Sequence, residues 1–211
     1  MIKVILCDDH ALIRRGIRDT LSDAPDIEVM GEAGDYGELR ALMRNHTCDV
    51  LVLDINMPGR SGLDVLHVLK DEGSTVKVLI VSMYPEDQYA IRALRAGAFG
   101  YVNKGGDPQL LVQAVRTVAQ GRKYVTPEIA QMLVESLTTP VTENAHEKLS
   151  DRELQTLVMI ASGKRLSDIA EELMLSPKTV SVYRARVLEK LGLANNSELT
   201  VYAIRNGLVG S

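Results

Sequence analysis

The chain has 211 residues, of which 45% are hydrophobic and 25% charged, and its formal net charge is −4 at pH 7. This composition is typical of a globular protein of one or two domains. No apolar run approaches the roughly 20 residues that a membrane-spanning helix needs, so no contact with a membrane is expected.

The N-terminal segment and the cysteines indicate a cytoplasmic location. Asp8 and Asp9 interrupt the first apolar run before the core of a signal peptide could form. Cys7 and Cys48 stand in apolar contexts without the CxxC spacing, so both are expected to be buried, reduced thiols.

Charge is distributed unevenly along the chain. From Lys148 onward there are nine Lys and Arg against seven Asp and Glu, a balance of +2, whereas the preceding residues carry 15 against 21, a balance of −6. An acidic front and a basic back indicate two domains, of which the basic one is the better candidate for contact with a polyanion.

The front of the chain alternates two patterns. Short β-branched runs predict five strands, and amphipathic stretches of helical period predict a helix after each of them. Because alternating strands and helices are typical of a parallel sheet covered on both faces, residues 1–121 are expected to form one α/β domain. The predicted strands are 2–7, 27–33, 49–54, 76–82 and 99–104, and the predicted helices are about 11–22, 35–45, 62–71, 86–96 and 107–120.

This regular alternation ends after the fifth predicted helix. Residues 126–137 can form one more helix, with Thr126 as its N-cap and Pro127 at the first helical position. The segment 138–148 is polar and lacks periodicity, which is typical of a linker. We therefore expect a linker over 122–147 that contains this helix.

Four short helical segments follow and predict a small all-α domain over 148–211. The first carries a capping box formed by Ser150 and Glu153. A tight turn separates it from the second, and the third begins with Ser-Pro and ends at Gly192. The segments are 149–163, 166–175, 176–192 and 196–207.

Polar residues stand at the carboxyl ends of four predicted strands. Asp8 and Asp9 follow the first strand, Asp54 ends the third, and Ser82 and Lys104 end the fourth and fifth. Because the carboxyl ends of parallel strands share one edge of a sheet, these side chains can converge. Neighbouring carboxylates repel each other unless a cation is near, and hard oxygen ligands fit Mg²⁺. Lys104 adds a positive charge able to pair with Asp54 or with a phosphoryl oxygen.

These residues carry a resemblance to a known family. The pair DD after the first strand, LDINMPGRSG after the third, and Ser82 and Lys104 after the last two resemble the receiver domain of bacterial response regulators. The tail, LSDREL…IAEELMLSPKTVSVYRARVLEKLGL, resembles the LuxR-type helix-turn-helix domain. Together they resemble the NarL/FixJ family. The resemblance implies a flavodoxin-like receiver with strand order 2-1-3-4-5, followed by a four-helix DNA-binding domain.

The resemblance implies a role for each acidic position. Asp54 would be the phosphoacceptor, and the phosphohistidine of a sensor histidine kinase would be the phosphoryl donor. Asp9 and Asp54 would bind Mg²⁺ together with the backbone carbonyl of Asn56, while Asp8 would act through a water molecule. Lys104 and the metal ion would offset the charge of the phosphoryl oxygens. The chain is thus expected to accept a phosphoryl group without being an enzyme.

The resemblance also implies a switch. Ser82 would hydrogen-bond the phosphoryl group and draw its loop inward, and Tyr101 would turn inward into the space vacated. Two positions depart from the usual receiver pattern. Gly105 follows Lys104 where many receivers have proline, which predicts a flexible turn without a cis peptide bond. Met83 is bulky where small residues are common, so it is expected to crowd the site.

The third segment of the tail has two faces. Val180 and Val187 lie on an apolar face that is expected to pack on the domain core. The suitable phosphate anchors are Lys178, Thr179, Arg184 and Lys190. The resemblance implies that the residues facing the major groove are Ser181, Val182 and Ala185, which are small and largely apolar.

Helix-turn-helix regulators bind paired half-sites as dimers. The last helix is apolar enough to pair two copies through Leu199, Val201, Tyr202 and Ile204. The expected function is a response regulator in which phosphorylation of Asp54 by a sensor histidine kinase controls homodimerisation and binding to promoter DNA.

Two other functions remain open. A constitutive helix-turn-helix protein with a vestigial receiver would keep the fold without the switch. An acid-lined pocket on a parallel sheet also suits a phosphatase of the haloacid dehalogenase type, although such enzymes place two aspartates two residues apart, and Asp8 and Asp9 are adjacent. His10 is interpreted as a helix-start residue and not a ligand, because Mg²⁺ prefers oxygen.

Overall fold

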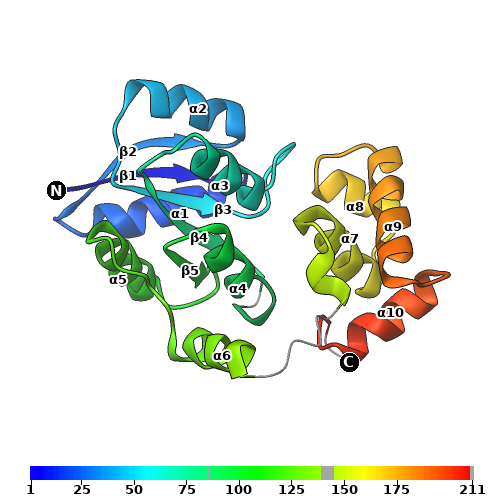
Figure 1. Cartoon of the computed structure of the whole chain (residues 1–211). Helices are drawn as coiled ribbons and strands as arrows, with labels where there is room; N and C mark the ends of the chain where they lie inside the picture. The colour runs from blue at the N-terminus through cyan, green and yellow to red at the C-terminus, as the bar shows by residue number, and fades with distance from the viewer. Residues whose placement is uncertain (85, 139–144, 210–211) are drawn as a thin grey trace. The chain divides into compact units, whose positions relative to one another are not determined.

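The chain forms two compact units. A computed structural model describes residues 1–84, 86–138 and 145–209 and divides the chain into Met1–Thr138 and Thr139–Ser211 (Figure 1). The first unit is α/β and the second is helical, as predicted. Among the described residues, none of the helices has both the length and the apolar character required to span a membrane.

The sheet of the first unit contains five parallel strands in the order β2-β1-β3-β4-β5, which confirms the predicted order. The central strand β3 is buried along its whole length because helices cover both of its faces, which explains its nearly continuous apolar sequence. The strands are β1 (Ile2–Cys7), β2 (Ile27–Ala33), β3 (Val50–Asp54), β4 (Lys77–Ser82) and β5 (Gly100–Asn103).

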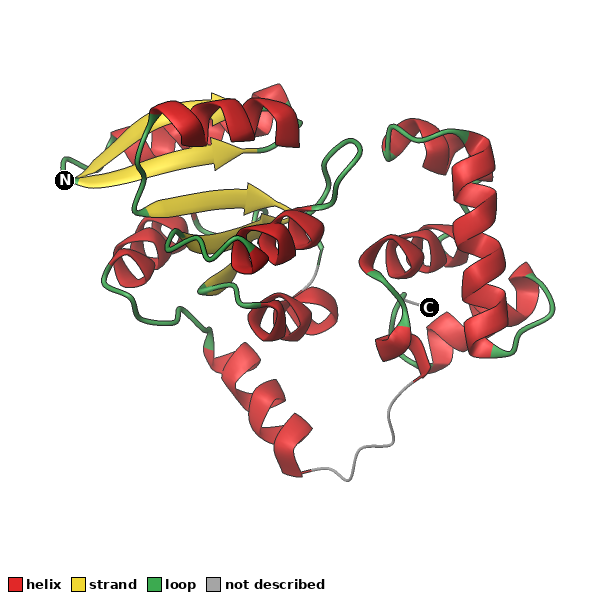
Figure 2. Cartoon of the chain, turned by 45° about the horizontal axis from the view of Figure 1, so that its top comes forward, coloured by secondary structure: helices red, strands yellow, loops and turns green. Residues whose placement is uncertain are grey.

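Helices lie on both sides of this sheet (Figure 2). On one face α1 and α5 share an apolar core with alternate strand residues such as Val4, Val52 and Val81. The intervening residues, such as Leu51 and Ile80, are equally buried on the opposite face. The helices of the alternating part are α1 (Ala11–Ser22), α2 (Tyr36–Asn45), α3 (Gly62–Asp71), α4 (Glu86–Ala96) and α5 (Pro108–Ala119).

Side-chain caps fix the start of several helices next to the carboxyl edge of the sheet. Ser61 and Asp64 form a capping box at α3, and Asp35 and Asp107 cap α2 and α5. By contrast, α1 begins after His10, whose side chain makes no capping hydrogen bond. The turn between β1 and α1 is therefore held by other contacts.

The chain continues along the edge of the sheet after α5. Tyr124 forms an isolated parallel bridge with Gly100 of β5, and its backbone N–H donates to the carbonyl of Phe99 at 2.8 Å. A Cβ on Gly100 would come within 2.9 Å of the carbonyl oxygen of Tyr124, so this close approach depends on glycine. Residues 122–126 thus cover the open edge of β5.

The extra helix after this segment, α6 (Pro127–Thr138), packs beside α4. Its N-cap is Thr126, as predicted: the hydroxyl accepts from the N–H of Ile129 at 3.3 Å and donates to Glu86 Oε2 at 2.8 Å. The sequence places this helix in a linker, whereas the structure includes it in the first unit because of these contacts. The predicted linker residues 139–144 lie outside the described residues.

The second unit is helical and packs around α7. The predicted capping box of Ser150 and Glu153 is present at its start. A short 3₁₀ helix, which the sequence analysis did not predict, precedes α7. The elements are η1 (Ala145–Lys148), α7 (Asp151–Ala161), α8 (Leu166–Glu172), α9 (Pro177–Leu191) and α10 (Asn196–Arg205). Met174 has φ 50°, a left-handed conformation that makes the tight turn between α8 and α9.

Candidate functional site

The register of the strands aligns the polar residues at one edge of the sheet. Asp54 pairs with Val81 of β4, one residue before Ser82. In turn Ser82 pairs with Asn103 of β5, and the N–H of Lys104 donates to the carbonyl of Ser82 at 2.8 Å. The convergence expected for the carboxyl ends of parallel strands is therefore present.

Lys104 joins two of the carboxylates. Its Nζ lies 2.9 Å from Asp54 Oδ2 and 2.7 Å from Asp8 Oδ2, and each of the three side chains is at most 3% exposed. Because the interaction is shielded from water, it is much stronger than an exposed ion pair at the same distance. One ammonium group thus neutralises part of a buried acidic cluster.

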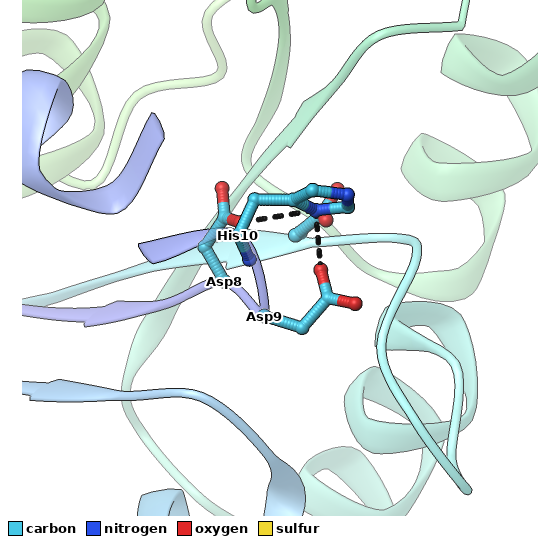
Figure 3. A group of neighbouring side chains, drawn as sticks. Asp8, Asp9 and His10 are labelled. Carbon is cyan, nitrogen blue, oxygen red and sulfur yellow. Dashed lines mark hydrogen bonds and ion pairs between the residues drawn. The ribbon is translucent and has the colours of Figure 1, made fainter. Parts of the chain in front are cut away.

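The turn after β1 supplies the other acidic group. Asp9 Oδ1 lies 2.6 Å from His10 Nδ1, and the His10 ring is the more exposed partner (Figure 3). Ligand atoms of Asp8, Asp9, His10 and Asp54 all lie within 4.8 Å of one another. The carboxylates therefore form an acidic cluster that could hold a metal ion.

The protonation of Asp54 reflects this environment. Burial raises the pKa of its carboxyl group from 3.8 to about 6, the Lys104 ammonium opposes this increase, and the neighbouring Asp8 adds to it. Asp54 therefore sits in the fold as a carboxylate whose charge is only partly compensated.

Tyr84, which the sequence analysis did not single out, connects the polar residues around this cluster. Its N–H donates to Ser82 Oγ at 3.1 Å, and its hydroxyl accepts from Asn56 Nδ2 at 3.2 Å. Its carbonyl accepts from Tyr101 Oη at 2.8 Å and from Asn103 Nδ2 at 3.2 Å. Two of its groups are main-chain atoms, which any residue would supply, so no sequence signal marks this position.

The structure also shows the conformations of Tyr101, Met83 and the Lys104–Gly105 peptide bond, about which the sequence made predictions. The Tyr101 ring is already turned inward and fully buried, and burial raises the pKa of its hydroxyl. The Met83 side chain is 62% exposed, so it does not fill the buried interior of the site. The peptide bond between Lys104 and Gly105 is trans, as are the others in the described part of the chain.

Gly62 supports Asp54 from behind. Its N–H donates to the carbonyl of Ile55 at 2.9 Å, and a Cβ at this position would lie 2.0 Å from the carbonyl oxygen of Asp54. The first residue of α3 must therefore be glycine for the helix to approach β3 this closely. The sequence alone does not mark this requirement, because only the fold brings the two residues together.

The helix α9 of the second unit has the two faces that were predicted. Val180 and Val187 are fully buried in the core. Of the predicted DNA contacts, the structure leaves five exposed: Lys178, Ser181, Val182, Ala185 and Lys190.

Three of the predicted contacts have partners inside the second unit. Lys190 Nζ lies 2.7 Å from Glu153 Oε2, and Arg184 Nε donates to Asn196 Oδ1 at 2.6 Å. The hydroxyl of Thr179 is 2.8 Å from that of Ser176. Ordinary spacing rules cannot show these pairings, since each joins α9 to another element or to its own cap.

Arg186 was not among the predicted contacts. It is exposed on α9, and it forms no hydrogen bond or ion pair with any residue in the described part of the chain. On α10, Leu199 is buried in the core, while Val201 and Ile204 are 47% and 45% exposed. Part of the apolar surface expected for pairing two copies is therefore accessible.

Comparisons with known proteins agree with this geometry. Residues 4–116 match the response regulator receiver domain, and residues 147–203 match the bacterial regulatory proteins of the luxR family. The chain is 40% identical over 209 residues to the response regulator UvrY of Escherichia coli K12, covering 99% of this chain and 96% of UvrY. It is 39% identical over 210 residues to GacA of Pseudomonas aeruginosa PAO1, covering 99% and 98%.

Solved structures of response regulators also resemble this chain. The response regulator ChrA of a heme-sensing two-component system matches with a TM-score of 0.51 and 31% identity, covering 99% of this chain and 98% of ChrA. RcsB from Salmonella enterica serovar Typhimurium, bound to promoter rprA in the presence of the phosphomimetic BeF3-, matches with a TM-score of 0.64 and 26% identity, covering 95% and 97%.

The parallel sheet with its acidic carboxyl edge and the separate helix-turn-helix unit define a two-component response regulator with a DNA-binding domain. The chain belongs to the NarL/FixJ family of response regulators, whose members combine a receiver with a LuxR-type domain.

Proposed function

We propose that a sensor histidine kinase phosphorylates Asp54, and that this modification controls dimerisation of the chain and its binding to promoter DNA. The observation that supports the proposal most directly is the buried contact of Lys104 with both Asp54 and Asp8. It holds a carboxylate at a strand end with a cation beside it, which is what transfer of a phosphoryl group requires.

The donor set of the cluster fits a hard divalent cation. Three carboxylates against one ammonium group leave net negative charge when all are ionised, and their oxygen atoms lie close together. Asp9, Asp54 and the carbonyl of Asn56 would hold Mg²⁺, with Asp8 acting through a water molecule. Bound Mg²⁺ supplies positive charge against the oxygens of the phosphoryl group.

The chain's own residues perform the transfer. A carboxylate oxygen of Asp54 attacks the phosphorus of the kinase phosphohistidine, the new O–P bond forms, and the P–N bond breaks with its electron pair remaining on the imidazole. Lys104 pairs with an oxygen of the transferred group. Ser82 donates its hydroxyl hydrogen to another, while its Oγ can still accept from the N–H of Tyr84, so that the Tyr84 loop moves with it.

The position of Tyr101 is coupled to the movement of the loop that contains Ser82 and Tyr84. Its hydroxyl already donates to the carbonyl of Tyr84, so movement of the loop toward the phosphoryl group would carry the inward ring with it or break that hydrogen bond. The switch is therefore proposed as a repositioning of the Tyr84 loop, with the Tyr101 ring inward as in this structure.

DNA binding is assigned to the exposed face of α9. Ser181, Val182 and Ala185 would face base edges in the major groove, with contact to thymine methyl groups as the main discrimination. The proposed phosphate contacts are Lys178, Thr179, Arg184 and Lys190, and we add Arg186 because it is exposed on the same helix. Two copies would pair through the exposed Val201 and Ile204 of α10. Because the proposed partner is chromosomal promoter DNA, the proposal places the protein in the cytoplasm.

Acyl-phosphate labelling of the full chain tests this proposal. Wild type, Asp54→Asn and the exposed control Asp71→Asn are incubated with a small phosphodonor, with and without Mg²⁺. We expect hydroxylamine-sensitive labelling of wild type and the control only, and only with Mg²⁺. The labelled proteins should then elute earlier in sizing chromatography and bind promoter DNA more tightly.

Three outcomes contradict the proposal in different ways. Labelling of Asp54→Asn at the wild-type level would refute the assigned phosphoacceptor. Labelling without any change in oligomeric state or DNA affinity would favour a constitutive DNA-binding protein. Steady release of phosphate from a phosphomonoester would favour a phosphatase.

A further inference from the structure

The turn between β1 and α1 carries two of the three carboxylates of the site. Asp8 is anchored to the sheet by its N–H, which donates to the carbonyl of Ala33 at 3.0 Å, and its Oδ1 accepts from the N–H of His10 at 2.8 Å. The helix that follows has no side-chain cap. The orientation of Asp9, the next residue, therefore depends on how firmly the main chain of this turn is held.

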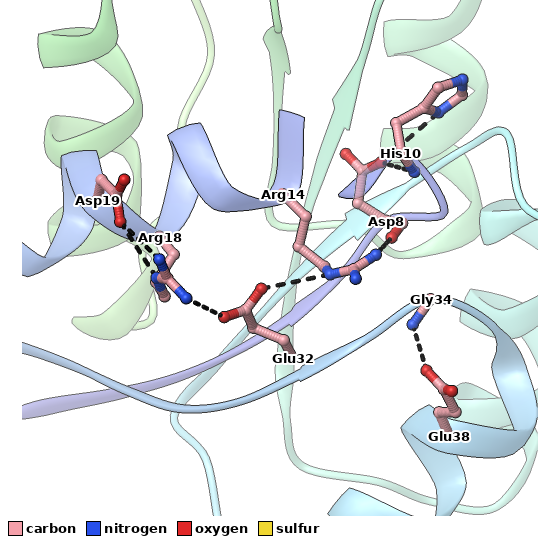
Figure 4. A network of polar contacts seen from close by, with 8 residues as sticks. All are labelled: Asp8, His10, Arg14, Arg18, Asp19, Glu32, Gly34 and Glu38. Atoms are coloured by element: carbon pink, nitrogen blue, oxygen red, sulfur yellow. Dashed lines mark hydrogen bonds and ion pairs between the residues drawn. The ribbon is translucent and has the colours of Figure 1, made fainter. Parts of the chain in front are cut away.

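Arg14, one turn into α1, supplies a further anchor from outside the site. Its Nη1 donates to the main-chain carbonyl of Asp8, and its Nε donates to Glu32 Oε2 on β2 at 3.3 Å (Figure 4). The second carboxylate oxygen of Glu32 accepts from Arg18 at 3.0 Å. One guanidinium group thus ties the acidic turn to the neighbouring strand, and a second arginine holds the strand carboxylate in place.

Asp8 is consequently held from two sides. Lys104 contacts its carboxylate at 2.7 Å, and Arg14 contacts its carbonyl, while the Arg14 side chain itself is only 20% exposed. A planar guanidinium donates along two fixed directions, so it fixes the angle between its two acceptors as well as their distance. An ammonium group at the same place could supply the charge but not this angle.

We propose that Arg14 is a positioning residue that fixes the orientation of the Asp8 and Asp9 carboxylates for a divalent cation. This inference rests on the proposed function, because it concerns the metal site on which that function depends. Arg14 contacts neither the metal ligand atoms nor Asp54, and acts through the main chain of the turn. Groups that orient metal ligands in this way typically change metal affinity by about 10- to 100-fold when they are removed.

Metal binding of the full chain tests the inference without measuring activity. Mn²⁺ is titrated into the protein and free Mn²⁺ is measured by electron paramagnetic resonance, with Mg²⁺ as competitor. We expect Arg14→Gln to weaken Mn²⁺ binding by roughly tenfold. The matched control is Arg15→Gln on the next residue, whose side chain is 72% exposed and, within the part of the chain that the structure describes, makes only a 3.8 Å pair with Asp19. It should bind Mn²⁺ like wild type.

Two further variants separate positioning from charge and from misfolding. Arg14→Lys keeps the positive charge but not the two fixed donor directions of the guanidinium group. It should therefore bind Mn²⁺ as weakly as Arg14→Gln does. Glu32→Gln should weaken Mn²⁺ binding less, and should add little to Arg14→Gln in the double variant, because Glu32 acts through Arg14. Thermal unfolding of every variant identifies any that has lost the fold, and Glu32→Gln then carries the test.

The outcomes distinguish this inference from the proposed function. Wild type that binds no Mn²⁺ at millimolar concentration would overturn both. Wild-type binding that Arg14→Gln and Glu32→Gln leave unchanged would overturn the positioning role alone. Wild-type affinity in Arg14→Lys would also overturn it, since the charge would then be sufficient.

Discussion

The burial of ionised Asp54 lowers the stability of the folded state, and the size of this loss depends on pH. Its carboxyl group has a pKa of about 6 in the fold instead of 3.8, so the folded state binds the proton more tightly than the unfolded state. The ionised side chain therefore costs stability above about pH 6, and the cost disappears as the pH falls toward 4. A pKa difference of about two corresponds to about 3 kcal/mol.

We expect Asp54→Asn to raise the free energy of unfolding at pH 8 by up to about 3 kcal/mol, and to change it little at pH 4. The increase is an upper bound because the substitution also removes one of the two partners of Lys104. Urea denaturation in metal-free buffer at both values of pH checks this, with Asp71→Asn as the exposed control. A gain that is equal at the two values of pH would contradict the explanation.

Gly62 gives a second prediction for a single residue. A Cβ at this position would lie 2.0 Å from the carbonyl oxygen and 2.9 Å from the carbonyl carbon of Asp54, and these main-chain atoms cannot move aside cheaply. Gly62→Ala should therefore lower the free energy of unfolding by about 1–3 kcal/mol and reduce labelling of Asp54.

The matched control is Gly16→Ala within α1, where a Cβ would meet no atom within 4 Å. Here the better helix propensity of alanine should raise stability by about 0.5–1 kcal/mol, with labelling unchanged. Equal labelling of both variants, measured at a temperature where both are folded, would show that α3 does not position Asp54.

At the level of elements, the hydroxyl group of Thr126 is one of the links between α6 and α4. Thr126→Val removes both the N-cap of α6 and the hydrogen bond to Glu86 while it keeps the shape of the side chain. We expect a loss of about 1 kcal/mol in stability and faster hydrogen exchange at the amide of Ile129.

Thr126→Ser should restore both quantities. Thr117→Val is the control within α5, because among the described residues its hydroxyl bonds only to the carbonyl of Gln113 in its own helix. If Thr126→Val leaves exchange at Ile129 unchanged, the hydroxyl does not hold the start of α6.

Some of the proposed DNA contacts on α9 also hold the second unit together, whereas Arg186 is proposed to contact DNA alone. Lys190 neutralises Glu153, whose side chain is 3% exposed, and the hydrogen bonds from Lys190 and Ser150 lower the pKa of Glu153 in spite of its burial. Lys190→Met should therefore lower stability by about 1 kcal/mol. Arg186→Met should leave stability within about 0.5 kcal/mol and weaken binding to all DNA sequences alike.

Thermal unfolding together with the salt dependence of DNA binding checks this division. The slope of log K against log salt should fall by about 1 in Arg186→Met. A loss confined to one base position would instead identify Arg186 as a base reader.

The sequence predicted what depends on local pattern or on the fixed geometry of a parallel sheet. The strands, the capping box of Ser150 and Glu153, and the meeting of Asp8, Asp54 and Lys104 follow from local pattern and from the shared edge of the carboxyl ends. Tyr84 was missed because most of its contacts use its own main-chain atoms, which leave no trace in the type of residue. Arg14 was missed because one of its acceptors is the main-chain carbonyl of Asp8, which no sequence pattern marks. The pairing of Lys190 was missed because its partner comes from another helix.

At the scale of the whole molecule, the helices from Lys148 onward, which include the helix-turn-helix, differ in charge balance from the residues before them. The residues before Lys148 carry a balance of −6 and the remainder +2. Phosphorylation of Asp54 would replace one carboxylate charge by about two phosphoryl charges, a net gain of about one negative charge in the part of the chain that is already acidic. The positive balance lies in the residues from Lys148 onward, which include the helix-turn-helix, and this suits association with a polyanion.

The segment that covers the edge of β5 determines at which residue the chain can be truncated to give a soluble first unit. A fragment ending at residue 121 would leave the backbone of Phe99 and Gly100 without Tyr124, and an uncovered outer strand invites aggregation. Light scattering should therefore find the fragment 1–121 polydisperse and poorly soluble, whereas the fragment 1–138 should remain monodisperse. Equal solubility of the two fragments would show that this covering is dispensable.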